Sequence, residues 1–199
     1  MSELYESFTG GNFSNDFKDT KWYGMTFTPQ ASHVLTSVKL YWYRVGSPGT
    51  VYVSLRATDG TYPITPDLDL TSMSSSLITT SSPGTWYEMA YTGGITLNQD
   101  TMYAFVMRCS GNSSNFLQYR FQYVSGTYAR GRLWYSPSSG VNGSWTNEGG
   151  QNSDGNFMEY GDLPGLSTSE IKGISTANIA EINGISLANI ESINDILVN

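Results

Sequence analysis

The sequence predicts an all-β fold, an antiparallel β-sandwich, followed by a short helical tail. Three observations lead to this prediction. Apolar and polar residues alternate along short segments, Gly- and Pro-containing turns separate those segments, and the C-terminal residues repeat a motif with a period of 11. Alternation with a period of two is the pattern of strands that bury one face. Repeats this short must stack on one another or on a partner.

The part of the chain that precedes the repeats contains nine segments with the composition of strands. Val51, Val53 and Leu55 alternate with more polar neighbours, as in a sheet with one solvated face. The same alternation recurs at Leu117, Tyr119 and Phe121. The nine segments are residues 22–28, 35–45, 50–57, 76–80, 85–91, 101–109, 115–122, 128–136 and 156–161. Dense turn sequences between them, such as Asp59-Gly60 and Ser82-Pro83-Gly84, favour an antiparallel sandwich of the jelly-roll type over residues 1–164.

Residues 165–199 are predicted to be short helical repeats. Residues 173–183 and 184–194 match at Gly, Ile, Ser, Ala, Asn, Ile, Ile and Asn. Ser175 and Ser186 lie where a helix N-cap is expected, and Asn183-Gly184 supplies a helix stop. The isoleucines of a continuous helix would form one stripe, and we expect them to be an assembly interface. They are Ile174, Ile179, Ile182, Ile185, Ile190, Ile193 and Ile196. A cap on the chain's own sandwich is the alternative.

Charge and composition exclude several classes of function. The formal net charge is −7 and no cluster of Lys and Arg occurs, so nucleic-acid binding is not expected. No apolar stretch is long enough for membrane insertion. Residues 1–6 have neither the basic region nor the apolar core of a signal peptide. This combination fits a protein that is made in a host cytoplasm and released by lysis, as virus particles are.

Residues with catalytic chemistry are few, and we predict that the chain is not an enzyme. His33 is the single histidine and is expected at a surface or strand edge, while the single cysteine, Cys109, lies in an apolar strand-like run and is expected to be buried and inert. The closest carboxylate pair, Asp67 and Asp69, is read as solvated turn chemistry rather than as a glycosidase pair.

No cofactor is expected. Residues 16–19 and 152–156 carry the oxygen-rich side chains that suit a calcium ion. The second segment lacks the downstream glutamate of a calcium loop, however, so solvated turns are the favoured interpretation of both.

Aromatic residues suggest a binding surface instead. The chain has five Trp and 14 Tyr, and sugar sites commonly stack an aromatic ring on the apolar face of a pyranose while polar groups bind its hydroxyls. Trp145, in a polar loop, is expected to be the exposed aromatic. The candidate glycan-binding residues are Trp145, Asn147, Trp134, Tyr128, Arg130 and Arg132.

Two resemblances extend this interpretation. The order of segments from Phe27-Thr28-Pro29 through residues 35–56 to Trp134-Tyr135-Ser136 resembles the jelly-roll domains, similar to carbohydrate-binding modules, of phage structural proteins and bacterial surface proteins. The Ile-Ser-x-Ala-Asn-Ile-x-x-Ile-Asn-Gly run at residue 174 is similar to C-terminal repeats of phage and prophage virion proteins.

Together these resemblances imply a non-catalytic virion structural protein. A capsid decoration or head-fibre protein and a tail-associated adhesin both fit. The implied partners are other virion proteins through the tail and a host-surface glycan through the jelly roll, and the tail also allows a homo-oligomer. The alternative is a bacterial cell-surface or secreted carbohydrate-binding module.

Overall fold

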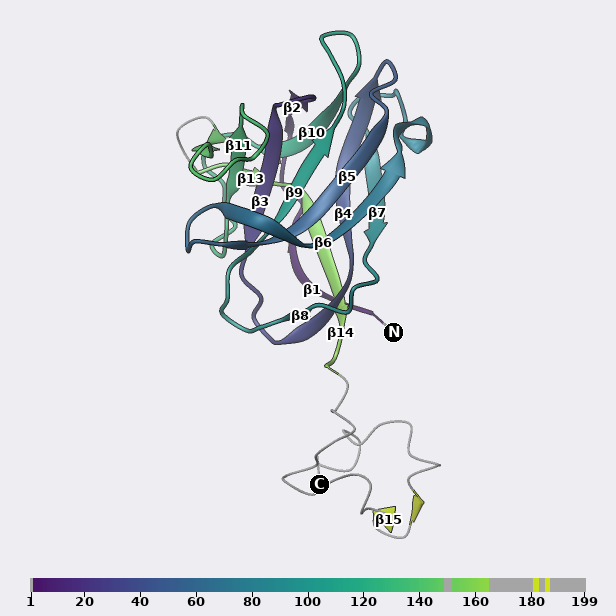
Figure 1. Ribbon diagram of the computed structural model, residues 1–199, viewed down its shortest axis with the longest axis vertical. Coiled ribbons are helices and arrows are strands. Elements are labelled where there is room, and N and C mark those ends of the chain that lie inside the picture. The colour runs from purple at the N-terminus through teal and green to yellow at the C-terminus, as the bar shows by residue number, and fades with distance from the viewer. Residues whose placement is uncertain (1, 149–151, 165–180, 183–184, 187–199) are drawn as a thin grey trace. The chain divides into compact units, whose positions relative to one another are not determined.

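The chain folds as an antiparallel β-sandwich in its first part. The computed structural model describes residues 2–148, 152–164, 181–182 and 185–186. The chain divides into two compact units, Met1–Leu163 and Pro164–Asn199. Within the described residues, the first unit contains an eight-stranded and a six-stranded sheet, whose long strands are seen in Figure 1.

The eight-stranded sheet is organised around one long central strand, β4 (His33–Val45), which pairs with β14, β10, β7 and β8. Its strand order is β1-β14-β4-β10-β13, and β2 pairs with β10. The other members are β1 (Glu3–Phe8), β2 (Phe13–Phe17), β7 (Thr85–Ala90), β8 (Thr96–Leu97), β10 (Phe116–Gln122), β13 (Asp154–Gly155) and β14 (Phe157–Asp162).

The six-stranded sheet has the order β12-β11-β3-β9-β5-β6, and its pairings are antiparallel throughout. Its members are β3 (Trp22–Phe27), β5 (Thr50–Thr58), β6 (Pro63–Ser74), β9 (Tyr103–Cys109), β11 (Leu133–Ser136) and β12 (Thr146–Asn147). A single turn of 3-10 helix, η1 (Ser75–Leu77), follows β6.

The predicted sandwich is confirmed, and the differences from the predicted strands have local causes. Residues 76–80 were expected to be a strand, but η1 occupies their start because the Ser74 hydroxyl accepts a hydrogen bond from the Ser76 amide. The predicted strand 128–136 is shortened to β11, since Arg130 and Gly131 run across the end of β3 instead of continuing the ladder. Strands β1, β2, β6, β8, β12 and β13 lie outside the predicted segments.

Aromatic rings join the two sheets at the centre of the core. Phe27 of β3 stacks on Phe105 of β9 with ring centroids 4.5 Å apart. Phe157 of β14, in the opposite sheet, lies 6.0 Å from Phe27 and 6.4 Å from Phe105. All three side chains are fully buried. The alternating residues Val51, Val53, Leu55, Leu117, Tyr119 and Phe121 also belong to this core, as predicted.

The helical repeats predicted for residues 165–199 are not shown by the structure. Four tail residues are described. Glu181–Ile182 (β15) and Ile185–Ser186 (β16) pair as two short antiparallel strands. Ile174, Ile179, Ile190, Ile193 and Ile196 lie outside the described residues.

Replacing the central phenylalanine of the core tests how far the sandwich depends on it. We expect Phe105→Ala to lower the free energy of unfolding by about 3–5 kcal/mol, because the buried ring leaves a cavity that the sheets cannot close. Leu77→Ala is the control, since Leu77 is 68% exposed and its loss should cost less than about 0.5 kcal/mol. Urea unfolding of both variants measures the difference, and equal costs would contradict this description of the core.

Candidate functional site

A cavity of about 510 Å³ lies beside the end of β3 in the first unit. One side is formed by residues 129–132 before β11, the other by the turn between β5 and β6 and by Met102. Two further lining residues come from the end of β3: Thr26 lies within the strand and Thr28 directly follows it. The lining residues are Thr26, Thr28, Gly60, Thr61, Met102, Ala129, Arg130, Gly131, Arg132 and Trp134.

Arg130 holds residues 129–132 in place. Its Nε donates a hydrogen bond to the Thr28 carbonyl oxygen at 2.7 Å, and its terminal nitrogen reaches the Pro29 carbonyl oxygen at 2.9 Å and Asp100 Oδ1 at 3.0 Å. The buried carboxylate of Glu6 lies 3.8 Å from the same guanidinium. Arg130 is therefore engaged with protein groups on several sides and acts as a structural clamp.

Arg132 differs from Arg130, because its backbone rather than its side chain is held. The Arg132 amide donates to the Thr26 hydroxyl at 2.9 Å, and that hydroxyl donates to the Arg132 carbonyl oxygen at 3.1 Å. Gly131 makes this close approach possible, since a Cβ there would overlap the Thr26 carbonyl oxygen. The Arg132 guanidinium lies 6.0 Å from the Trp134 ring and makes no hydrogen bond or ion pair with any described residue.

The opposite side of the cavity is a turn stabilised by its own aspartate. Asp59 Oδ1 accepts hydrogen bonds from the amides of Thr61 and Tyr62 at 2.9 and 3.0 Å. Gly60, which directly follows Asp59, has a φ of 94°, a value that favours glycine. The Thr58 hydroxyl ties the turn to the Met102 carbonyl oxygen at 3.1 Å. Both sides of the cavity are thus held by hydrogen bonds, which reach residues distant in sequence on the first side and lie largely within the turn on the second.

Trp145 is not the exposed aromatic that the sequence predicts. It is 6% exposed and packs with Trp134, Ala104 and Val106, against which Trp22 also lies. The prediction is wrong because residues around 140 fold back onto the six-stranded sheet, where Arg56 donates a hydrogen bond to the Gly140 carbonyl oxygen at 3.1 Å. A tryptophan in a polar loop can therefore be buried when the loop is anchored over a sheet.

The six candidate glycan-binding residues separate into two groups. Arg130, Arg132 and Trp134 line the cavity. Tyr128, Trp145 and Asn147 are not among its lining residues. The Tyr128 hydroxyl donates to Glu6 Oε2 at 2.8 Å, and its ring contacts Phe157 edge-on at 5.3 Å, whereas Asn147 pairs with Trp134 between β12 and β11. The sequence did not identify the other lining residues, namely the threonines, the turn at Gly60 and Met102. They come from separate segments with no shared sequence pattern.

His33 is fully buried, which corrects the expected surface position. Its Nε2 lies 2.6 Å from Glu159 Oε1, its Nδ1 lies 2.9 Å from the Ala31 carbonyl oxygen, and Tyr5 stacks on the ring at 3.7 Å. The carbonyl requires Nδ1 to carry a proton, so the short contact at Nε2 shares a second proton with Glu159. The alternation of β4 places His33 inward, and Glu159 of β14 lies close enough to pair with it.

This buried pair holds protons more tightly in the folded state. Burial alone would lower the pKa of His33, but the hydrogen bond and charge of Glu159 raise it above 6.5. Burial raises the pKa of Glu159. Because both pKa values are higher in the folded than in the unfolded chain, the pair's contribution to stability is present at low pH. This contribution is lost as the pH rises from the pKa values of the unfolded chain through those of the folded chain.

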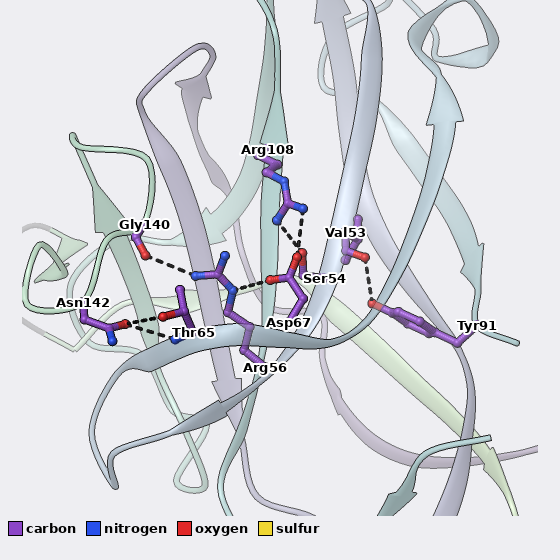
Figure 2. A network of polar contacts seen from close by, with 9 residues as sticks. All are labelled: Val53, Ser54, Arg56, Thr65, Asp67, Tyr91, Arg108, Gly140 and Asn142. Atoms are coloured by element: carbon purple, nitrogen blue, oxygen red, sulfur yellow. Dashed lines mark hydrogen bonds and ion pairs between the residues drawn. The ribbon is translucent and has the colours of Figure 1, made fainter. Parts of the chain in front are cut away.

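Asp67 is also tied into the protein rather than solvated, which corrects its predicted role. Both Asp67 and Asp69 lie in strand β6. Figure 2 shows Asp67 between two arginines, with its Oδ1 2.6 Å from Arg56 Nε and its Oδ2 3.0 Å from Arg108. Burial alone would raise the pKa of Asp67, but the hydrogen bonds and charges of the two arginines hold it below its usual value.

Neither Cys109 nor the first of the two segments considered for calcium presents a free reactive group. Cys109 is 3% exposed, as predicted, and burial raises its pKa to about 12; it lies in the other sheet from His33. The Asp16 carboxylate is paired with Lys18 at 2.6 Å and Lys21 at 3.2 Å. Within the described ranges, no group of three or more His, Cys, Asp and Glu side chains gathers as a metal site.

Two comparisons with known proteins give no relative. No protein-family model matches the chain, and no curated protein matches its sequence. Over the part of the chain that the structure describes, no helix combines the length and the apolar character that crossing a bilayer requires.

The buried pair can be tested by nuclear magnetic resonance, because His33 is the single histidine and its ring signals need no assignment. We expect His33 in the wild-type protein to titrate above 6.5. In Glu159→Gln its pKa should fall, since the partner charge is removed and burial remains. Glu88→Gln, which removes a half-exposed carboxylate on β7, should leave the titration unchanged. An identical titration in Glu159→Gln and wild type would disprove the coupling.

The two arginines of the cavity should differ in their effect on stability. Arg130→Gln removes hydrogen bonds to two backbone carbonyls and to Asp100, and we expect it to lower the free energy of unfolding by about 1–3 kcal/mol. Arg132→Gln should change it by less than about 0.5 kcal/mol. Chemical denaturation measures both values, and a larger loss for Arg132→Gln would contradict the assignment of Arg130 as the clamp.

Proposed function

We propose that this chain is a non-catalytic structural protein of a phage virion, which displays its β-sandwich and attaches to neighbouring subunits through residues 165–199. The observation that carries the proposal is the repeat. Eight of 11 positions are identical between residues 173–183 and 184–194, and isoleucine occupies three of them. Such repeats need a neighbour to cover their apolar residues, and in a virion the neighbouring subunits provide that cover.

The sandwich contributes binding rather than catalysis to this proposal. Its cavity combines hydroxyl groups, a guanidinium group and a tryptophan ring at one place, which are the groups that hold a saccharide in shallow protein sites. We therefore assign the cavity to a host-surface glycan. The residues with acid–base or nucleophilic chemistry also support binding over catalysis. His33 and Asp67 are engaged in ion pairs, and burial raises the pKa of Cys109 to about 12.

Two positions in the particle are compatible with this function. A capsid decoration or head-fibre protein uses the tail to dock on the capsid, and a tail-associated adhesin uses it within a fibre. A bacterial cell-surface or secreted carbohydrate-binding module is the second candidate, and the cavity favours it equally. The two candidates differ in the tail, because a free-standing carbohydrate-binding module does not require self-assembly.

The mass of the protein in solution tests the role of the tail. We expect the full chain to be oligomeric and residues 1–164 to be monomeric, with equal midpoints of thermal unfolding, because the residues of the hydrophobic core cluster belong to the first unit. Light scattering after size exclusion measures both masses.

A matched pair of variants separates the isoleucines from the tail as a whole. Ile179→Ser with Ile190→Ser changes equivalent positions of the two repeats, while Thr176→Ser with Ala180→Ser changes positions at which the repeats differ. The first pair should abolish the oligomer and the second should preserve it. If the full chain and residues 1–164 are both monomers, self-assembly through the tail is wrong.

A further inference from the structure

Two arginines line the cavity, and they are not equivalent. The Arg130 guanidinium is neutralised by Asp100 and Glu6 and bound to two carbonyl oxygens. Arg132 is a half-buried residue whose guanidinium lies 6.0 Å from the Trp134 ring and has no hydrogen-bond or ion-pair partner among the described residues. A partly desolvated cation without a partner is a strong site for an anionic group, since hydrogen bonds to charged groups are among the strongest in proteins.

Uncharged polar groups surround this free cation. Thr28 and Thr61 line the same cavity, and neither hydroxyl is used in a hydrogen bond with another described residue. The Thr26 hydroxyl, by contrast, is hydrogen-bonded to the backbone amide and carbonyl oxygen of Arg132. The cavity thus offers one cation and two available hydroxyl groups together with the Trp134 side chain, within a volume of about 510 Å³, which is ample for one or two sugar rings.

The surrounding charge limits the anion that the cavity accepts. Asp59 supports the turn at one side, Asp100 pairs with Arg130, and Asp154 is close enough to Arg132 for the arginine to affect its pKa. These carboxylates and the net charge of −7 repel a polyanion such as a sulfated glycan or a nucleic acid. A single carboxylate matches the one free guanidinium, because the planar fork of arginine binds a carboxylate through two parallel hydrogen bonds.

From these observations we infer that the cavity selects an acidic sugar, a uronic acid residue whose carboxylate pairs with Arg132 and whose hydroxyls face Thr28 and Thr61. The inference rests on the glycan-binding part of the proposed function and narrows the ligand to one class of sugar. Trp134 supplies an apolar ring near the cation, so the ring of the sugar and its carboxylate are recognised at neighbouring points.

Matched methyl glycosides test the inference on the full chain. Methyl glucuronide and methyl galacturonide differ from methyl glucoside and methyl galactoside in having a carboxylate in place of the hydroxymethyl group. In chemical-shift titrations we expect at least one uronide to bind about tenfold more tightly than its neutral counterpart, which corresponds to about 1.4 kcal/mol. Arg132→Gln should remove this difference, and Arg132→Lys should retain part of it.

Controls separate the charge of Arg132 from the charge of the protein as a whole. Lys39→Gln removes one positive charge from strand β4 of the other sheet and should leave the tenfold preference intact. Thermal unfolding of Arg132→Gln is measured alongside, and we expect an unchanged midpoint. Acetate at the same concentrations should bind at least tenfold more weakly than the preferred uronide.

Each contrary result has a separate meaning. Equal binding of uronides and neutral glycosides would overturn the acidic selectivity and leave glycan binding in place. Acetate binding as tight as that of the uronides would show that the carboxylate alone is recognised and would overturn the saccharide assignment. Absence of binding by all four glycosides would overturn this inference together with the glycan part of the proposed function, while the tail's role would still be decided by the mass measurement.

Discussion

The aromatic contact between the two sheets is the interaction on which the rest of the sandwich depends. Phe27 and Phe105 stack within one sheet, and Phe157 meets both from the other. Aromatic side chains bury the largest areas of any residues and prefer particular mutual orientations, so their packing sets both the separation and the relative position of the sheets. A sandwich without this centre would retain its hydrogen-bonded ladders, but the packing that holds the two sheets face to face would be weakened.

The cavity is connected to this centre through a short series of contacts. Phe157 touches Tyr128 edge-on, the Tyr128 hydroxyl donates to Glu6, and Glu6 lies beside Arg130. Arg130 then anchors its segment to the carbonyls that follow β3. The position of the cavity therefore follows from core packing, and its shape is determined before any ligand arrives. Such preorganisation reduces the entropic cost of binding.

One buried ion pair and a half-buried cluster of three charges add specificity to this framework. His33 with Glu159 fixes the beginning of β4 against β14, and Asp67 with Arg56 and Arg108 fixes β6 against β5 and β9. Pairs of this kind contribute little net stability, because desolvation of the charges offsets their attraction, but the loss of one partner is costly. They favour one register over its neighbours, since a slip of one residue would leave each buried charge alone. The network in Figure 2 also holds the loop at Gly140 over the sheet, which is what buries Trp145.

The sequence by itself determined the all-β class, most of the long strands and the inward residues of β5 and β10, because alternation is a local consequence of the strand's period of two. It also identified Cys109 as buried and selected Arg130, Arg132 and Trp134, since these residues lie close together in an unusual run. Tertiary structure alone decided the burial of His33 and Trp145 and the ion pairs of Asp67. Each is covered by a partner that is distant in sequence, namely Glu159, Arg108 and Trp22, and no local pattern encodes that proximity. The same reason separates the two arginines: they are neighbours in sequence with similar surroundings there, but Glu6 and Asp100 reach only one of them.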